Sequence, residues 1–84
     1  MIKSQKEEER VQRLLGAAFK DQQLRVFYVN NPSGKELAIR GAVAMIDMAT
    51  SKVRIIGDTG AYRIDVNDIR DIRLASDVSE TAMN

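Results

Sequence analysis

The segment from residue 36 to residue 47, ELAIRGAVAMID, places strong limits on the fold of this chain. Its apolar and small residues alternate in the way that is typical of a β-strand. Strands usually run for about five or six residues, so this one is unusually long. Gly41 stands near its middle, and a glycine inside a strand often marks a bulge or a sharp bend. We therefore predict that one extended strand leaves a first sheet at Gly41 and enters a second. One side of this strand carries four larger apolar residues: Leu37, Ile39, Val43 and Met45.

The residues before the first strand are predicted to form a helix from residue 4 to residue 20. Ser4 and Glu7 fit the S-x-x-E capping box, in which the two side chains satisfy free backbone amides at the helix start. Gly16 weakens this helix but need not end it. The apolar residues recur with helical spacing and form one stripe: Val11, Leu14, Leu15 and Ala18.

From Leu24 the pattern changes to a period of two, which indicates further strands over residues 24–29, 53–56 and 61–66. A short closing strand would include Ile72 and Leu74. The cluster NNPSGK, residues 30–35, predicts a turn, and Pro32 excludes it from a central strand because proline lacks the amide hydrogen.

Two finer details of the strands can be argued from charge and capping. Like charges directly opposite each other destabilise a strand pair, so we prefer the register with Arg54 opposite Asp65 to the register with Arg54 opposite Arg63. After that hairpin, Asn67 or Asp68 is expected to cap a single helical turn.

One helix followed by five short, closely spaced strands predicts a mainly β fold. The expected architecture is a small antiparallel five-stranded SH3-like or Sm-like barrel, whose closure would remove most exposed strand edges. A chain of 84 residues is expected to form one domain, here residues 1–75. Residues 76–84 are polar, small and aperiodic, and are predicted to form a flexible C-terminal tail.

Composition excludes several chemistries. The chain has no cysteine and no histidine, so the usual zinc ligands, thiol nucleophiles and general bases near neutral pH are missing. We expect no cofactor, no bound metal and no enzymatic activity. No apolar run approaches the length of a membrane span, and no signal peptide is recognised, so a cytoplasmic protein without membrane contact is expected. Each aspartate of the strand region is interpreted as structural: Asp47, Asp58, Asp65, Asp68 and Asp71.

The net charge of +1 does not demand a nucleic-acid partner, yet basic residues gather on one face of the predicted helix. They could contact phosphates or an acidic protein surface, and the alternative is an ordinary solvated face. Arginines of the strands extend this candidate contact set, which comprises Lys6, Arg10, Arg13, Lys20, Arg25, Arg54 and Arg63.

The stretches LRVFYVNN, IRGAVAMID, KVRII and YRIDVNDIRDI, in this order after a helix that ends in LLGAA, resemble the YolD-like family of bacteria and their phages. The resemblance covers residues 11–74. It implies an Sm-like barrel without catalytic residues, and a role as an accessory partner of Y-family translesion DNA polymerases in the DNA damage response. Gly41, Asp47 and Asp68 match the family pattern, and we interpret them as a bend, a turn and a cap.

Two functions are therefore favoured over an enzymatic one. The first is a non-enzymatic protein-interaction module, either a polymerase accessory or a phage-encoded regulator. The alternative is an Sm-like nucleic-acid-binding protein that uses the basic helix stripe and the arginines of the strands. A sheet with an open edge could also form a homo-oligomer by strand addition.

Overall fold

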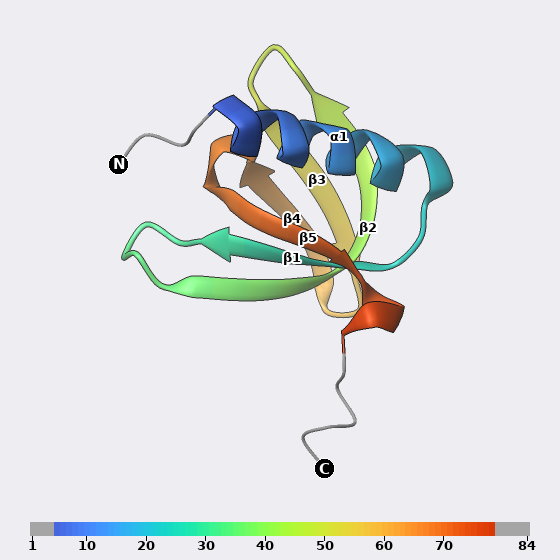
Figure 1. Cartoon of the computed structure of the whole chain (residues 1–84). Helices are drawn as coiled ribbons and strands as arrows, with labels where there is room; N and C mark the ends of the chain where they lie inside the picture. The colour runs from blue at the N-terminus through green and yellow to red at the C-terminus, as the bar shows by residue number, and fades with distance from the viewer. Residues whose placement is uncertain (1–4, 79–84) are drawn as a thin grey trace.

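A computed structural model describes residues 5–78, in which one helix is followed by a five-stranded antiparallel sheet and two short 3-10 helices (Figure 1). This confirms the predicted mainly β fold with one N-terminal helix. The elements, in chain order, are α1 (Gln5–Asp21), β1 (Arg25–Asn30), β2 (Glu36–Asp47), β3 (Lys52–Gly57), β4 (Gly60–Asp65), η1 (Val66–Asp68), β5 (Ile69–Leu74) and η2 (Ala75–Asp77).

The long strand β2 has the predicted bounds and holds the sheet together. Its first half pairs with β1 and its second half with β3, and Gly41 pairs with both Arg25 and Gly57. The strand therefore changes partners at Gly41, but within one continuous sheet and not between two sheets as predicted. A Cβ atom at Gly41 would lie 2.6 Å from the backbone oxygen of Ile56 and 2.7 Å from the Cγ2 atom of Ile55. Glycine is required here because β3 approaches too closely for a side chain.

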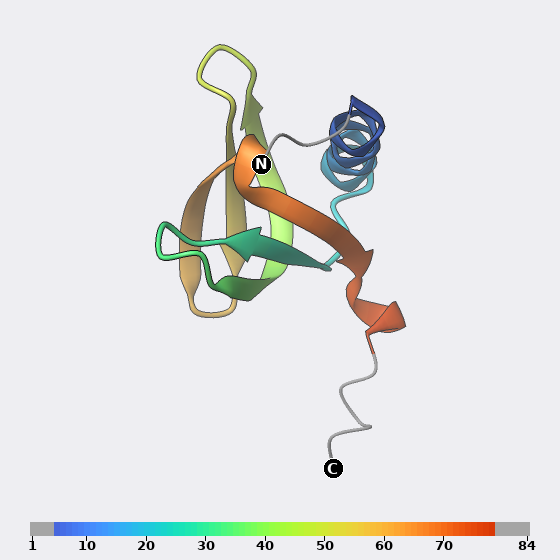
Figure 2. The ribbon, with the colours of Figure 1, turned by 60° about the vertical axis from the view of Figure 1, so that its left-hand side comes forward.

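The predicted closure of the barrel is wrong. The strand order is β4-β3-β2-β1-β5, so β4 and β5 remain the two edges of a curved, open sheet. Helix α1 lies against one side of this sheet, where it packs on β2 and β5 (Figure 2). Its apolar stripe enters the core through Val11, Leu15 and Ala18.

The core lies between α1 and the inner side of the sheet. Its largest fully buried side chains are Phe27, Val43, Val53, Ile55 and Ile69, which come from β1, β2, β3 and β5. Truncating such side chains to alanine costs about 2–5 kcal/mol in typical cores, so this small cluster dominates the stability of the fold.

Alternation predicts that Val43 and Met45 lie on the same side of β2, but a β-bulge between them places them on opposite sides. Val43 pairs with Ile55, whereas Met45 pairs with the preceding residue, Arg54, so one extra residue lies between them. The bulge turns Met45 outward, where it is 56% exposed, and brings Ile46 against the core. Leu37, near the tip of the projecting β1–β2 hairpin, is also exposed (Figure 1).

The preferred register of the β3–β4 hairpin is also wrong. Arg54 lies opposite Arg63, and Lys52 lies opposite Asp65. Asp65 is held by Lys52, whose ammonium lies 3.1 Å from its carboxylate, and it also accepts a hydrogen bond from the Asn67 backbone N–H at 2.9 Å. These two bonds hold Asp65 at the end of β4, and the observed register keeps them even though it places two exposed arginines opposite each other, which is unfavourable.

The start of η1 corrects one further expectation. Asp65, and not Asn67 or Asp68, is the N-cap of η1. The capping box at Ser4 falls outside the described residues. The 3-10 helix η2 covers Ala75–Asp77 at the start of the predicted tail, and residues 79–84 lie outside the described residues.

Candidate functional site

The outer face of β2, β3 and β4 carries a row of three exposed side chains. Met45, Arg54 and Arg63 are successive cross-strand partners, one from each strand. The alternating residues Val53 and Ile64 point to the core, so the row lies on the side of the sheet away from it. A groove of about 360 Å³ follows this row, and its lining residues are Met45, Asp47, Lys52, Val53, Arg54, Ala61, Tyr62 and Arg63.

The charges in this groove are unequally compensated. Lys52 is paired with Asp65, and the pKa of Asp65 lies below its usual value because its carboxylate accepts a hydrogen bond from the Asn67 backbone N–H and, second, from Lys52. Arg54 and Arg63 are exposed, and neither forms an ion pair with any residue between 5 and 78. Arg54 and Arg63 are direct cross-strand partners, so they create a local positive charge for which no described residue provides an ion-pair partner.

Asp47 lies at the edge of the same groove but forms no ion pair with either arginine. Its carboxylate accepts hydrogen bonds from the backbone N–H groups of Ala49, at 3.0 Å, and Thr50, at 3.4 Å. These bonds hold the turn between β2 and β3, so Asp47 serves the turn as its position in the sequence indicates.

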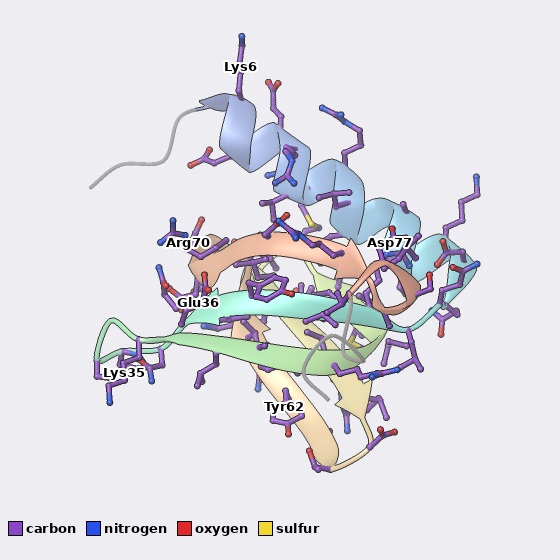
Figure 3. All side chains as sticks on the ribbon, turned by 60° about the horizontal axis from the view of Figure 1, so that its bottom comes forward. Lys6, Lys35, Glu36, Tyr62, Arg70 and Asp77 are labelled. Atoms are coloured by element: carbon purple, nitrogen blue, oxygen red, sulfur yellow. The ribbon has the colours of Figure 1, made fainter. Side chains whose placement is uncertain are left out.

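This arrangement can bind anions. Two neighbouring guanidinium groups can each donate paired hydrogen bonds to a carboxylate or a phosphate. Met45 beside them supplies a flexible apolar surface. The hydroxyl of Tyr62, which Figure 3 labels on β4, is hydrogen-bonded to the hydroxyl of Thr59. No group of three or more acidic side chains that could hold a metal ion occurs in the described chain.

The structure removes Arg25 from the candidate contact set. Its guanidinium makes two bonds to the carboxylate of Asp21, at 2.6 and 2.9 Å, and the residue is only 7% exposed. These bonds raise the pKa of Arg25 and lower the pKa of Asp21 to about 2. Arg25 therefore fixes the exit of α1 against the start of β1 instead of facing a partner.

The basic residues of the helix are separated from the arginine pair. Arg10 is bound to Asp71 of β5 at 2.7 Å. Lys6, Arg13 and Lys20 are exposed, and Lys6 projects away from the sheet (Figure 3). Because α1 covers the inner side of the sheet, its exposed cations and the outer-face arginines cannot form one continuous surface. The single candidate surface thus divides into two.

The sequence did not predict a cluster of three charged residues around Asp71. Arg10 and Arg73 each bind one oxygen of the Asp71 carboxylate, and the Arg73 guanidinium lies 5.8 Å from the ring centre of Tyr28. Arg10 and Asp71 are 61 positions apart, so local spacing contains no signal for this contact.

Comparisons of the chain with protein-family models, with curated proteins and with solved structures found no match. Over residues 5–78, no helix is long and apolar enough to cross a membrane.

Proposed function

We propose that this protein is a non-enzymatic interaction module that binds an acidic surface of a partner protein through the outer face of β2, β3 and β4. The observation that carries the proposal is the direct opposition of Arg54 and Arg63 without a carboxylate partner in the described chain. Like charges directly opposite each other reduce sheet stability, so the pair brings no benefit to the fold itself. An acidic partner would relieve the repulsion and gain two charge-assisted contacts.

The groove beside the pair fits a protein partner. Met45 is 56% exposed, and the neighbouring Ile56 is 45% exposed, so apolar area accompanies the charge. Interfaces between proteins combine apolar contact with charged groups that set orientation and association rate. The absence of histidine and cysteine from the sequence also favours binding over catalysis.

The resemblance to the YolD-like family suggests what this partner would be. It favours a Y-family translesion polymerase and a role in the DNA damage response, with a phage-encoded regulator of a host protein as the other form of the same proposal. The action would take place in the cytoplasm.

Nucleic-acid binding is the second candidate, and one specific observation favours it. Lys6, Arg13 and Lys20 are exposed on α1, and they form no ion pair within the described residues. They offer a phosphate-binding stripe on a different side of the molecule from the arginine pair. Binding of single-stranded RNA or DNA should then weaken steeply with salt and should depend on these three residues.

The test is co-purification of tagged protein from cells that encode it. The variant Arg54→Glu/Arg63→Glu should lose the partner by at least about tenfold, which is about 1.4 kcal/mol. The variant Arg13→Glu/Lys20→Glu changes the net charge equally on the helix and should retain it. Loss of the partner only in the helix variant, or recovery of nucleic acid alone, would contradict the proposal.

A further inference from the structure

A second groove lies on the other side of the β2–β3 hairpin. It has a volume of about 330 Å³ and is enclosed by α1, the end of β2, the following turn and η1. Its apolar part is formed by Leu15, Ile46, Met48 and Val66. Met48 is 72% exposed, the largest exposed fraction among the large hydrophobic residues of the described chain.

Gly16, on the helix side of this groove, has no explanation within the fold. A Cβ atom built at Gly16 would meet no atom within 4 Å, so neither β2 nor the core requires its absence. Its backbone does not require glycine either, since its φ angle is not positive. A glycine inside a helix is destabilising relative to alanine. What Gly16 does provide is open space in the groove.

The rim of the groove is polar, and none of its described residues carries a positive charge. A smaller hollow of about 40 Å³ shares Gln12, Val66 and Asn67 with it and is lined in addition by Glu8. Among residues 5–78, no lysine or arginine lines either hollow. Glu8 is exposed and has no ion-pair partner from residue 5 to residue 78. A ligand that lies along the groove would therefore meet apolar side chains first and then a free carboxylate.

We propose that this groove, which we name the Gly16 groove, binds a peptide segment of another protein that has apolar side chains followed by a lysine or arginine. The apolar side chains lie against Leu15, Ile46 and Met48, in the space that Gly16 leaves open. The basic side chain pairs with Glu8. The side-chain amides of Gln12 and Asn67 can bond to the main chain of the peptide.

The Gly16 groove lies apart from the outer face of β2, β3 and β4 that carries Arg54 and Arg63. The bulge at residues 43–45 turns Met45 to the outer face and Ile46 to the groove, so the two surfaces use opposite sides of the same hairpin. The protein would bind an acidic surface on one side and an apolar, basic segment on the other.

The probes are two synthetic peptide libraries of about ten residues, each with two leucines spaced three or four positions apart, as in helical segments that bind grooves. One library has a fixed lysine after the second leucine, and the other has a fixed glutamate. Peptides from the lysine library should be enriched on the immobilised wild-type protein, and the variant Glu8→Lys should lose this preference.

Two variants test the position of binding. Gly16→Leu should fill the groove and weaken the selected lysine peptides by at least about tenfold, whereas Ala17→Leu, on an exposed part of the same helix, should not. Met48→Arg, at an exposed position that leaves the core intact, should weaken them as well. Circular dichroism checks that each variant is folded.

The proposal is overturned by no enrichment, by equal enrichment from both libraries, or by undiminished binding to the Gly16→Leu and Met48→Arg variants. A wild-type dimer in sedimentation equilibrium that Gly16→Leu dissociates would assign the groove to a second copy of the chain, which also overturns it. Because Arg54 and Arg63 are unchanged in these variants, failure here is distinguishable from failure of the proposed function.

Discussion

Arg10 and Asp71 join the two ends of the fold: the guanidinium of Arg10 on α1 lies 2.7 Å from the carboxylate of Asp71 on the edge strand β5. The same carboxylate binds Arg73 at 3.0 Å through its other oxygen. Helix α1 covers a sheet that does not close, and this contact fixes it to one of the two open edges. Partial burial raises the pKa of Asp71. The hydrogen bonds from Arg10 and Arg73 lower it by more than burial raises it, so the pKa of Asp71 lies below its usual value.

The variant Asp71→Asn should therefore loosen the helix. We expect a loss of about 1 kcal/mol in the free energy of unfolding, a modest value because the Arg10 side chain is half exposed to water. Urea unfolding at neutral pH measures the change. Asp68→Asn is the matched control, since Asp68 is exposed and does not cap η1, and it should change the free energy by less than about 0.5 kcal/mol. Equal effects of the two variants would contradict the role of Asp71.

Two glycine-to-alanine variants should act in opposite directions. At Gly41 the added methyl group would collide with the backbone of Ile56, so Gly41→Ala should cost at least about 1–3 kcal/mol. At Gly16 nothing obstructs it, and Gly16→Ala should stabilise the protein by about 0.5–1 kcal/mol. Thermal unfolding distinguishes the two. A stable Gly41→Ala protein would show that β3 does not approach β2 as closely as described.

The ion pair between Asp21 and Arg25 predicts part of the acid sensitivity. The pKa of Asp21 is lowered to about 2 in the folded protein, chiefly by the hydrogen bond from Arg25, whereas its ordinary value is 3.8. A carboxyl group with a lowered folded-state pKa stabilises the protein above the unfolded-state pKa, and this contribution is lost as the pH falls through the folded-state pKa. The window is thus from about pH 4 down to about pH 2.

Asp21→Asn should flatten the dependence of the free energy of unfolding on pH within that window. Urea unfolding between about pH 2 and about pH 5 measures the slope of the free energy of unfolding against pH, because this range includes both pKa values of Asp21. Parallel curves for the variant and the wild-type protein would mean that the pair with Arg25 does not form.

Features encoded by short-range pattern were predictable from the sequence. The stripe of Val11, Leu15 and Ala18 gave the helix, and the alternation over residues 36–47 gave β2 with its correct bounds. Gly41 is the predicted turning point of this strand, and it is the residue at which β2 changes its pairing partner from β1 to β3. These predictions succeeded because helix and strand periods are properties of neighbouring residues.

Features that depend on competition between distant groups were not predictable. The register of β3 and β4 follows from Asp65, which is bound by both Lys52 and the backbone N–H of Asn67. The bulge before Met45 leaves no clear trace in the alternation of β2. The sheet stays open, with β4 and β5 at its two edges, and strand patterns alone do not show whether the two edge strands pair.

The candidate site was anticipated only in part. Arg54 and Arg63 were selected as contact residues, yet the predicted register would have separated them, and their direct opposition is what distinguishes the site. Arg25 was selected because it is charged, but its partner Asp21 lies just beyond the expected helix end at residue 20. Nothing in the sequence distinguishes Glu8 and Gly16 from other helix residues, because the two hollows that they line are formed with residues of distant elements.

The central claim is that Arg54 and Arg63 lie opposite each other to serve a partner and not the fold. The variant Arg63→Glu tests it directly, because it places a carboxylate opposite Arg54. We predict that its free energy of unfolding is unchanged or higher by about 0.2–1 kcal/mol, while recovery of the protein partner falls at least about tenfold. A variant that is clearly less stable than the wild-type protein, or one that retains the partner fully, would contradict the account.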